Sequence, residues 1–436
     1  MGDDLRSGGG RPAFETERAE TRALVLHPDL QSDPGRRAPQ ARLEEARALA
    51  AALPGLDLVG AEIVTLKSAQ PGTLFGSGKM QEIATRVQAD EIGLVLIDGP
   101  VTPVQQRNIE QKWKTKVLDR TGLILEIFAD RAATREGVLQ VELAALSYQR
   151  TRLVRAWTHL ERQRGGLGFV GGPGETQIEA DRRAIDEAIT RLRRQLAKVT
   201  KTRALHRAAR AKVPFPVVAL VGYTNAGKST LFNRITGSAV LAKDMLFATL
   251  DPTMRAVTLE TGTKVILSDT VGFISDLPTH LVAAFRATLE EVLEADLILH
   301  VRDISHPDSD EQAADVEKIL AELGVDADVP VCELWNKVDR LGPDVRATVE
   351  TIAARRDDVI TLSAATGEGT EAVICHVTES LDAMRQRTTL DLGFADGKRR
   401  AWLHEHRVVE SERQREAGWQ LDVHWTPRQR DAFNRL

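Results

Sequence analysis

One stretch of the chain, VVALVGYTNAGKSTLF from Val217 to Phe232, restricts the possible folds more than any other. Its first five residues are apolar and mostly β-branched, which is typical of a buried strand in a parallel sheet. The run G-x-x-x-x-G-K-S follows from Gly222 to Ser229, and a helical pattern begins at Lys228. A strand, a glycine-rich loop and a helix in this order predict a phosphate-binding loop rather than a chance turn.

The residues of this loop have distinct predicted roles. Gly222 and Gly227 allow a tight backbone whose N–H groups point at phosphates, and the start of the next helix adds the positive end of its dipole. Lys228 supplies a positive charge for the β- and γ-phosphates, and the Ser229 hydroxyl is expected to bind Mg²⁺. The other loop residues expected to line the nucleotide are Tyr223, Thr224, Asn225, Ala226 and Thr230.

A D-T-V-G motif, from Asp269 to Gly272, follows the predicted strand 264–268. Its aspartate is expected on the Mg²⁺ side of the site, and its glycine is placed to meet the γ-phosphate. Together with Lys228, Gly272 is therefore a candidate catalytic residue. The nucleotide-lining residues of this motif are Asp269, Thr270, Val271 and Gly272.

Two later motifs favour guanine over adenine. Asp339, in N-K-x-D, is expected as a buried carboxylate that accepts two hydrogen bonds from guanine, whereas adenine lacks that donor pair. A backbone N–H near Ser363 and Ala364 is expected to meet guanine O6. The residues concerned are Asn336, Lys337, Val338, Asp339, Ser363, Ala364 and Ala365. In this order the motifs resemble a translation-factor-related GTPase domain over residues 214–384, with GTP and GDP as its ligands.

The N-terminal part of the chain predicts a second α/β unit. Residues 1–20 are rich in glycine and charge, which indicates a disordered tail. Short strands alternate with helices over residues 21–135, as in a small parallel α/β domain. The sequence Gly76-Ser77-Gly78-Lys79 looks like half a phosphate loop, but Met80 stands where Ser or Thr is needed. We expect a turn that caps the following helix instead.

Residues 136–212 predict a helical hairpin. One helical pattern ends at Gln163, residues 165–174 are rich in glycine, and a second pattern runs from about Glu175 to Lys212. The apolar residues of the second helix are spaced like a coiled-coil seam: Ile178, Ile185, Ile189, Leu192, Leu196 and Val199. These patterns predict an antiparallel two-helix stalk with a glycine-rich tip. With about 25 residues per arm, each helix would be roughly 38 Å long.

The second helix of this stalk has a basic exposed face. A solvated helix face and a contact surface for RNA phosphates are both compatible with such a charge run, and the length of the stalk favours the second. The candidate RNA-binding residues are Arg182, Arg183, Arg191, Arg193, Arg194 and Lys198.

Net charge, cysteine content and the lengths of the apolar runs limit the compartment and the class of protein that fit this sequence. The net charge of −5 argues against a globally basic nucleic-acid binder but permits a local basic patch. The two cysteines, Cys332 and Cys375, fall in predicted core elements, which fits free thiols in a reducing cytoplasm. No signal peptide and no apolar run of 18 residues is found, so we expect no membrane span.

Several long strings of the N-terminal part resemble HflX-type GTPases, of the Obg–HflX group of translation-factor-related GTPases. They are FGSGK (Phe75–Lys79), PVQQRN (Pro103–Asn108), DRTGLILEIFADRAATREGVLQVELA (Asp119–Ala144), RLVRAWTHLERQ (Arg152–Gln163) and GGPGETQIEADRR (Gly171–Arg183). With the GTPase motifs the resemblance covers residues 22–384. It implies a ribosome-associated GTPase that binds the large (50S) subunit and its rRNA, places the stalk loop near the peptidyl-transferase region and splits stalled or idle ribosomes.

The resemblance also assigns roles in the first switch. Thr249 matches the family's switch threonine, a Mg²⁺ ligand and catalytic residue, with Thr253 as a fallback. The switch residues expected near the nucleotide are Phe247, Ala248, Thr249, Leu250 and Asp251. Asn225 resembles a potassium ligand of related GTPases, although an Asn that bonds its own loop is an equal alternative.

Phe273 stands where a water-orienting Gln often sits in small GTPases. An apolar side chain cannot position the attacking water, so intrinsic hydrolysis is expected to be slow unless a partner or a nearby polar residue completes the site.

The sequence thus predicts a P-loop GTPase domain, preceded by a small parallel α/β domain with a two-helix stalk. A small α+β appendage follows at residues 385–436, where Trp residues are expected mainly to pack. We expect a cytoplasmic monomer. The alternatives left open are a GTPase for ribosome assembly or tRNA modification, and a regulatory switch whose stalk binds a protein.

Overall fold

The computed structural model describes residues 20–32, 37–163, 173–210, 215–237, 246–247, 253–259, 262, 264–275, 291–326, 328–434 and 436. Within these ranges, the side chains of 153–163, 173–178, 200, 202–210 and 428 are not described. Residues 1–19 of the expected tail and residues 165–172 of the glycine-rich tip lie outside the described residues, whereas Pro173 and Gly174 already belong to the second stalk helix.

The N-terminal domain alternates strands and helices. Its elements are β1 (Thr21–Leu30), α1 (Pro39–Ala52), β2 (Leu56–Leu66), α2 (Ser77–Ala89), β3 (Leu94–Ile97), α3 (Pro103–Trp113), β4 (Lys116–Asp119) and α4 (Arg120–Arg131). The four strands are parallel in the order β2-β1-β3-β4, which confirms the prediction of a parallel α/β domain. Sequence reasoning missed α4, because this helix begins directly after β4, with Asp119 as its N-cap and no turn residue between the two elements.

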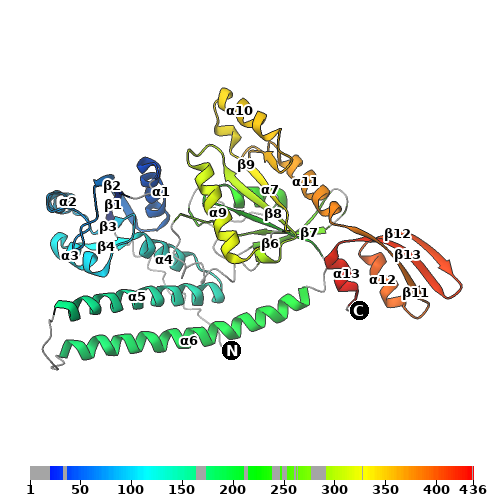
Figure 1. The fold of residues 1–436 in the computed structure, drawn as a ribbon, viewed down its shortest axis with the longest axis horizontal. Helices are drawn as coiled ribbons and strands as arrows, with labels where there is room; N and C mark the ends of the chain where they lie inside the picture. The colour runs from blue at the N-terminus through cyan, green and yellow to red at the C-terminus, as the bar shows by residue number, and fades with distance from the viewer. Residues whose placement is uncertain are drawn as a thin grey trace, which may run out of the picture.

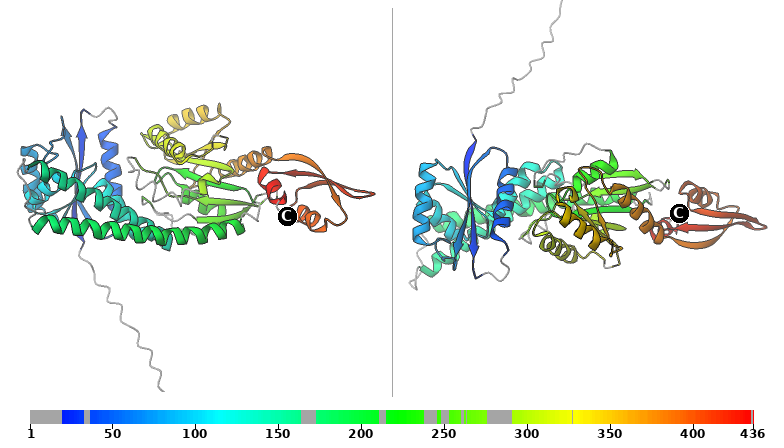
Figure 2. Two further views of the ribbon diagram at one scale, coloured as in Figure 1. Left: turned by 60° about the horizontal axis from the view of Figure 1, so that its bottom comes forward. Right: turned by 90° about the horizontal axis from the view of Figure 1, so that it is seen from above.

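The stalk consists of α5 (Arg135–Gln163) and α6 (Pro173–Arg210), which run antiparallel and side by side (Figures 1 and 2). In the seam, Ile189 and Leu192 are buried, and Arg150 of α5 forms an ion pair with Asp186 of α6 at 2.8 Å. Figure 1 shows α6 continuing beyond the end of α5 towards the next domain. The predicted hairpin is thereby confirmed for its two arms.

The central domain has a six-stranded sheet. Its elements are β5 (Val217–Gly222), α7 (Lys228–Thr236), β6 (Thr253–Thr258), β7 (Lys264–Asp269), β8 (Leu297–Asp303), α9 (Ser309–Leu323), β9 (Val331–Asn336), η1 (Val338–Arg340), α10 (Pro343–Ala353), β10 (Val359–Thr361) and α11 (Thr370–Ala383). The strand order is β10-β9-β8-β5-β7-β6, and β6 alone among these six is antiparallel to its neighbour. Cys332 is buried as expected, but Cys375 is exposed on α11, so its placement in the core was wrong.

The C-terminal domain is a separate α+β unit at the far end of the molecule (Figure 1). Its elements are β11 (Gln386–Gly393), α12 (Gly397–Glu405), β12 (Val409–Arg415), β13 (Gly418–Trp425) and α13 (Pro427–Asn434). The antiparallel sheet β11-β13-β12 has its own core, in which Trp425 packs against Phe433. The expected packing role of tryptophan is confirmed at Trp425.

The N-terminal and central domains share one hydrophobic core, whereas the C-terminal domain does not contribute to it. Phe128 of α4 meets Phe247 of the central domain edge to face, with ring centroids 4.6 Å apart. Among the described helices, none is both long enough and apolar enough to cross a membrane.

Candidate nucleotide site

The loop between β5 and α7 has the geometry that its glycines predict. Gly222 has φ +149°, and a Cβ there would lie 2.2 Å from the carbonyl oxygen of Val301. Gly227 has φ +100°, and its Cβ would lie 2.2 Å from Nδ2 of Asn336. A side chain at either position would be strained and would collide, so this loop requires glycine.

Lys228 is buried at the start of α7. Its Nζ donates hydrogen bonds to the carbonyl oxygens of Gly222 at 3.0 Å and Tyr223 at 2.8 Å. Burial lowers the pKa of Lys228 to about 8, although the charge of Asp269 opposes this shift. A cation held inside the loop by backbone carbonyls alone is well placed to gain an anionic ligand.

Ser229 and Asp269 form the expected oxygen pair. The Ser229 hydroxyl donates to Oδ2 of Asp269 at 2.7 Å, which joins the start of α7 to the end of β7. A hydroxyl and a carboxylate are hard oxygen ligands of the kind that Mg²⁺ prefers, so the donor set fits this ion. Thr253 begins β6 and pairs with Asp269 across the sheet.

The phosphate loop is joined directly to the D-T-V-G segment. The Thr224 N–H donates to the Phe273 carbonyl at 2.7 Å, and the Phe273 N–H donates to the Gly222 carbonyl at 3.1 Å. A Cβ on Gly272 would lie 3.1 Å from Lys228 Nζ, so two of the three candidate catalytic residues are brought together, and the third, Thr249, lies outside the described residues. Phe273 is 1% exposed and belongs to the shared core, so its side chain offers nothing to orient water.

Asn336 connects three of the motifs. Its Nδ2 donates to the Ala226 carbonyl at 2.7 Å, and its Oδ1 accepts from the Ala364 N–H at 2.9 Å. The Ala364 N–H already bonds Asn336, so the N–H expected near Ser363 and Ala364 for guanine O6 is a different one of this segment. Asp339 is exposed rather than buried as expected, because it lies in the short helix η1, of which only Val338 is buried.

Two supporting residues of the guanine side were missed from the sequence. Arg234 of α7 donates through Nε to the Ala364 carbonyl at 2.7 Å and through Nη2 to the Ala365 carbonyl at 2.5 Å. Asp303 at the end of β8 pairs with Lys337 Nζ at 2.7 Å, and Lys337 has φ +69°. No local motif marks either residue, since their partners are 130 and 34 residues away in the chain.

The first switch is described only in part. Ala248, Thr249, Leu250 and Asp251 lie outside the described residues. The Phe247 side chain is buried in the shared core against Phe128, which leaves only its backbone for a nucleotide. Asn225 is exposed with φ +59°, a conformation that Asn adopts more readily than most residues.

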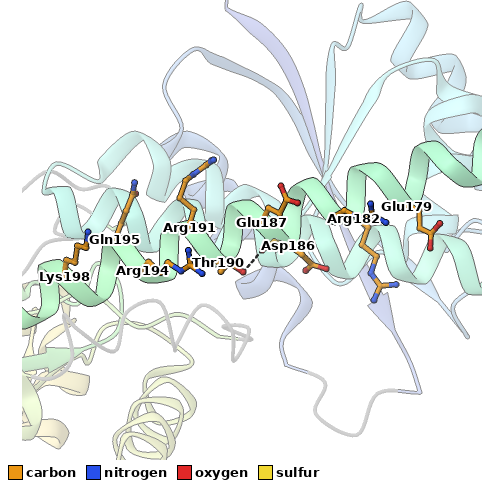
Figure 3. A pocket seen from close by; sticks show the side chains of 10 residues that line it. Glu179, Arg182, Asp186, Glu187, Thr190, Arg191, Arg194, Gln195 and Lys198 are labelled. Atoms are coloured by element: carbon orange, nitrogen blue, oxygen red, sulfur yellow. Dashed lines mark hydrogen bonds between the residues drawn. The ribbon is translucent and has the colours of Figure 1, made fainter.

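All six candidate RNA-binding residues are exposed on α6, and Figure 3 labels four of them: Arg182, Arg191, Arg194 and Lys198. Five of the six line one open groove: Arg182, Arg183, Arg191, Arg194 and Lys198. Glu179, Asp186 and Glu187 line the same groove, so its charge is mixed although basic residues outnumber acidic ones. Arg193 is exposed outside it.

Four family models match consecutive parts of the chain. They are described as GTP-binding GTPase N-terminal (residues 40–129), GTP-binding GTPase middle region (131–210), 50S ribosome-binding GTPase (217–337) and HflX C-terminal domain (348–436). The last model spans α11 together with the C-terminal domain, for which the sequence alone offered no motif.

Curated relatives match most of the chain. GTPase HflX of Magnetococcus marinus is 50% identical over 91% of this chain and 91% of its own length. GTPase HflX of Escherichia coli is 45% identical over 81% of this chain and 82% of its own. A solved GTP-binding protein of Sulfolobus solfataricus, in complex with GDP, covers 83% of this chain and 98% of its own at 24% identity and a TM-score of 0.45. By its sequence relatives, the chain belongs to the GTPase HflX family and is a P-loop enzyme that hydrolyses GTP to GDP and phosphate.

Proposed function

We propose that this GTPase binds the large ribosomal subunit through its stalk in a nucleotide-dependent manner, and that it thereby separates stalled or idle ribosomes. The observation that carries the proposal is the stalk itself, whose exposed basic face extends from a domain that shares its core with the GTPase domain. The central family model, described as a 50S ribosome-binding GTPase, supports the same partner. We expect the protein to act as a monomer in the cytoplasm.

In the proposed site, Lys228 and the backbone amides of residues 222–230 bind the β- and γ-phosphates. Ser229 and Asp269, with Thr249 from the switch, would hold Mg²⁺, which when bound supplies positive charge to the phosphate oxygens. Gly272 lies close to Lys228 and would offer its N–H to the γ-phosphate. Because Phe273 cannot orient water, hydrolysis depends on another group. A K⁺ ion held by Asn225 is one candidate for added positive charge at the phosphates.

On the guanine side, Asp339 would accept the N1–H and N2–H₂ hydrogens of the base. Since the Ala364 N–H already bonds Asn336, the neighbouring Ala365 N–H is the better donor to guanine O6. Arg234 and Asn336 would hold this segment in place from opposite sides.

The test is co-sedimentation with purified ribosomes and subunits, with a non-hydrolysable GTP analogue compared with GDP. Analogue-dependent binding to the large subunit is expected, and the double variant Arg191→Glu/Arg194→Glu should lose it. A matched control, Lys318→Glu/Arg355→Glu, makes the same change of charge at exposed positions of the central domain and should bind normally. No binding of the wild-type protein in either nucleotide state would refute the ribosomal role.

The acidic residues in the α6 groove favour one alternative, a protein partner for the stalk. Salt dependence separates the two. RNA phosphate contacts make affinity fall steeply with salt, whereas a mixed-charge protein interface gives a shallow slope. Co-purification of tRNA or of precursor subunits, in place of mature large subunits, would instead indicate a role in tRNA modification or assembly.

A further inference from the structure

A buried polar network joins the N-terminal domain to the GTPase domain. The GTPase side contributes Tyr223, the second residue of the phosphate loop, and Ser275, which follows the D-T-V-G segment. The N-terminal side contributes Glu45 of α1, Asp98 after β3 and Arg120 at the start of α4. Tyr223, Ser275, Asp98 and Arg120 are each at most 6% exposed.

Arg120 is the centre of this network. Its Nη1 donates to Oδ1 of Asp98 at 2.5 Å, and its Nη2 donates to Oε2 of Glu45 at 2.8 Å. The same Nη2 reaches the Ser275 hydroxyl oxygen at 3.0 Å and the Ser275 carbonyl oxygen at 3.2 Å. The Arg120 guanidinium thus connects two carboxylates of the N-terminal domain to the carbonyl and hydroxyl groups of Ser275 in the GTPase domain.

Tyr223 and Ser275 are also bonded to each other. The Ser275 N–H donates to the Tyr223 hydroxyl oxygen at 2.6 Å, and the Tyr223 hydroxyl donates to Oε1 of Glu45. The Ser275 hydroxyl donates to Oε2 of Glu45 at 3.0 Å and accepts from Arg42. Glu45 therefore holds both GTPase-domain residues through its two carboxylate oxygens.

Both held residues are next to the reacting centre. The Tyr223 carbonyl accepts the hydrogen bond from Lys228 Nζ at 2.8 Å. Ser275 follows Gly272 by three residues, and Gly272 approaches both Thr224 and Lys228 closely. A displacement of Tyr223 or Ser275 would therefore move the residues expected to contact the γ-phosphate.

The network contains buried charged groups, which require their partners in a defined arrangement. Although burial opposes ionisation, Arg120 and the hydrogen bond from His27 hold the pKa of Asp98 far below its usual range, and Glu45 and Asp98 raise the pKa of Arg120. The groups stay charged while buried, so each needs its partners in place. An apolar contact tolerates sliding, whereas a connected polar network is satisfied in one arrangement only.

We propose that Glu45 and Arg120 are positioning residues for GTP hydrolysis, because they hold Tyr223 of the phosphate loop and Ser275 beyond D-T-V-G. The N-terminal domain and the GTPase centre then respond to the nucleotide as one unit. This role rests on the GTPase site and is independent of ribosome binding.

The test uses the full-length protein without ribosomes and measures single-turnover and steady-state GTP hydrolysis. Tyr223→Phe and Glu45→Gln each remove part of the network with little change of shape. Each is expected to lower kcat roughly 3- to 30-fold, the range typical of residues that act through another group. KM for GTP should change little, because the guanine contacts lie elsewhere. The double variant should be no slower than the slower single variant, because both changes break the same connection.

Tyr148→Phe is the matched control. Tyr148 is the other tyrosine of the chain, and its hydroxyl also bonds a buried carboxylate, that of Asp119, but both residues lie outside the GTPase domain. Its loss should leave kcat unchanged. Urea unfolding of every variant checks the fold. If Glu45→Gln does not fold, Arg120→Lys replaces it both as the single variant and in the double variant.

The proposal is overturned if Tyr223→Phe leaves kcat unchanged, if only KM shifts, if the fold-changes of the single variants multiply in the double, or if Tyr148→Phe slows hydrolysis equally. Lys228→Ala, assayed in parallel, shows separately whether the measured hydrolysis comes from this site.

Discussion

Two segments of this protein lead from a loop into the first turn of a helix with Gly and Lys, Gly76–Lys79 at α2 and Gly222–Lys228 at α7, and they differ in the space around their glycines and in the partners of their lysines. In the N-terminal loop, a Cβ on Gly76 or Gly78 would meet nothing within 4 Å. In the loop of the GTPase domain, Gly222 and Gly227 have positive φ and no space for a side chain. Gly76 serves as the N-cap of α2, as the sequence predicts, whereas Gly222 ends a buried strand.

The two lysines also differ, both in their bonding partners and in the direction in which their pKa is shifted. Lys79 forms ion pairs with Glu62 at 3.0 Å and Glu82 at 2.7 Å. Partial burial opposes these interactions, but they outweigh it and raise the pKa of Lys79. Lys228 is held by carbonyl oxygens, and burial lowers its pKa to about 8. An anion site thus requires a cation that carboxylates have not already neutralised, and the short motif alone does not reveal this.

The largest expected effect comes from exchanging the lysines for alanine. Lys228→Ala should reduce kcat/KM for GTP by roughly 10²- to 10³-fold, as for other single groups that stabilise charge in a transition state. Lys79→Ala should change it less than about twofold, because Lys79 is already paired with Glu62 and Glu82 in the N-terminal domain and is not expected to contact the nucleotide. Steady-state phosphate release measures both, and equal losses would refute the contrast between the loops.

The glycines provide the second comparison. Gly222→Ala should lower the free energy of unfolding by about 3 kcal/mol or more, since strain at a positive φ adds to a collision with the Val301 carbonyl. Gly76→Ala, with open space around it, should stay within about 0.5 kcal/mol. Urea unfolding distinguishes them, and a stable, nucleotide-binding Gly222→Ala protein would contradict the described loop.

The N-terminal sheet and the central sheet each also contain a buried histidine, His27 in β1 and His300 in β8. Burial lowers the pKa of His300 to about 4, so its neutral form stabilises the fold. This contribution is complete above pH 6.5 and is lost as the pH falls towards 4. Relative to His300→Gln, the wild-type protein should lose up to about 3 kcal/mol of stability over this interval. If urea unfolding instead shows that both proteins lose the same free energy of unfolding between pH 6.5 and 4, the pKa of His300 is not lowered by burial.

The smallest expected effect comes from replacing the asparagine whose side chain bonds a backbone carbonyl of each loop. Asn336 bonds the Ala226 carbonyl, and Asn108 bonds the Gly72 carbonyl at 2.9 Å. Asn336→Ala should weaken GDP binding about tenfold through its lost hydrogen bonds, whereas Asn108→Ala should leave it unchanged. Titration with a fluorescent GDP derivative reports the affinities. A comparable loss in both variants would mean that the N-terminal loop also affects the nucleotide.

Sequence reasoning succeeded where local pattern and local physics agree. The helix predicted to begin at Lys228 and the first stalk helix predicted to end at Gln163 have those bounds, because their apolar period and the glycines beside these ends are readable from neighbouring residues. It failed at α4, which follows β4 without a turn residue between them, and at Cys375, which lies on the exposed side of α11. Burial of a helix face depends on what packs against it, and a single helical pattern does not contain that information.

The phosphate loop, each of its partner motifs and the two-helix stalk can be read from the amino-acid sequence, because each is defined by residues close together in the chain. The connections between these parts are visible only in the folded protein. Tyr223 bonds Glu45 across 178 residues of chain, and Arg120 bonds Ser275 across 155. Such contacts arise from the packing of one domain on another, which brings together side chains that no local periodicity relates.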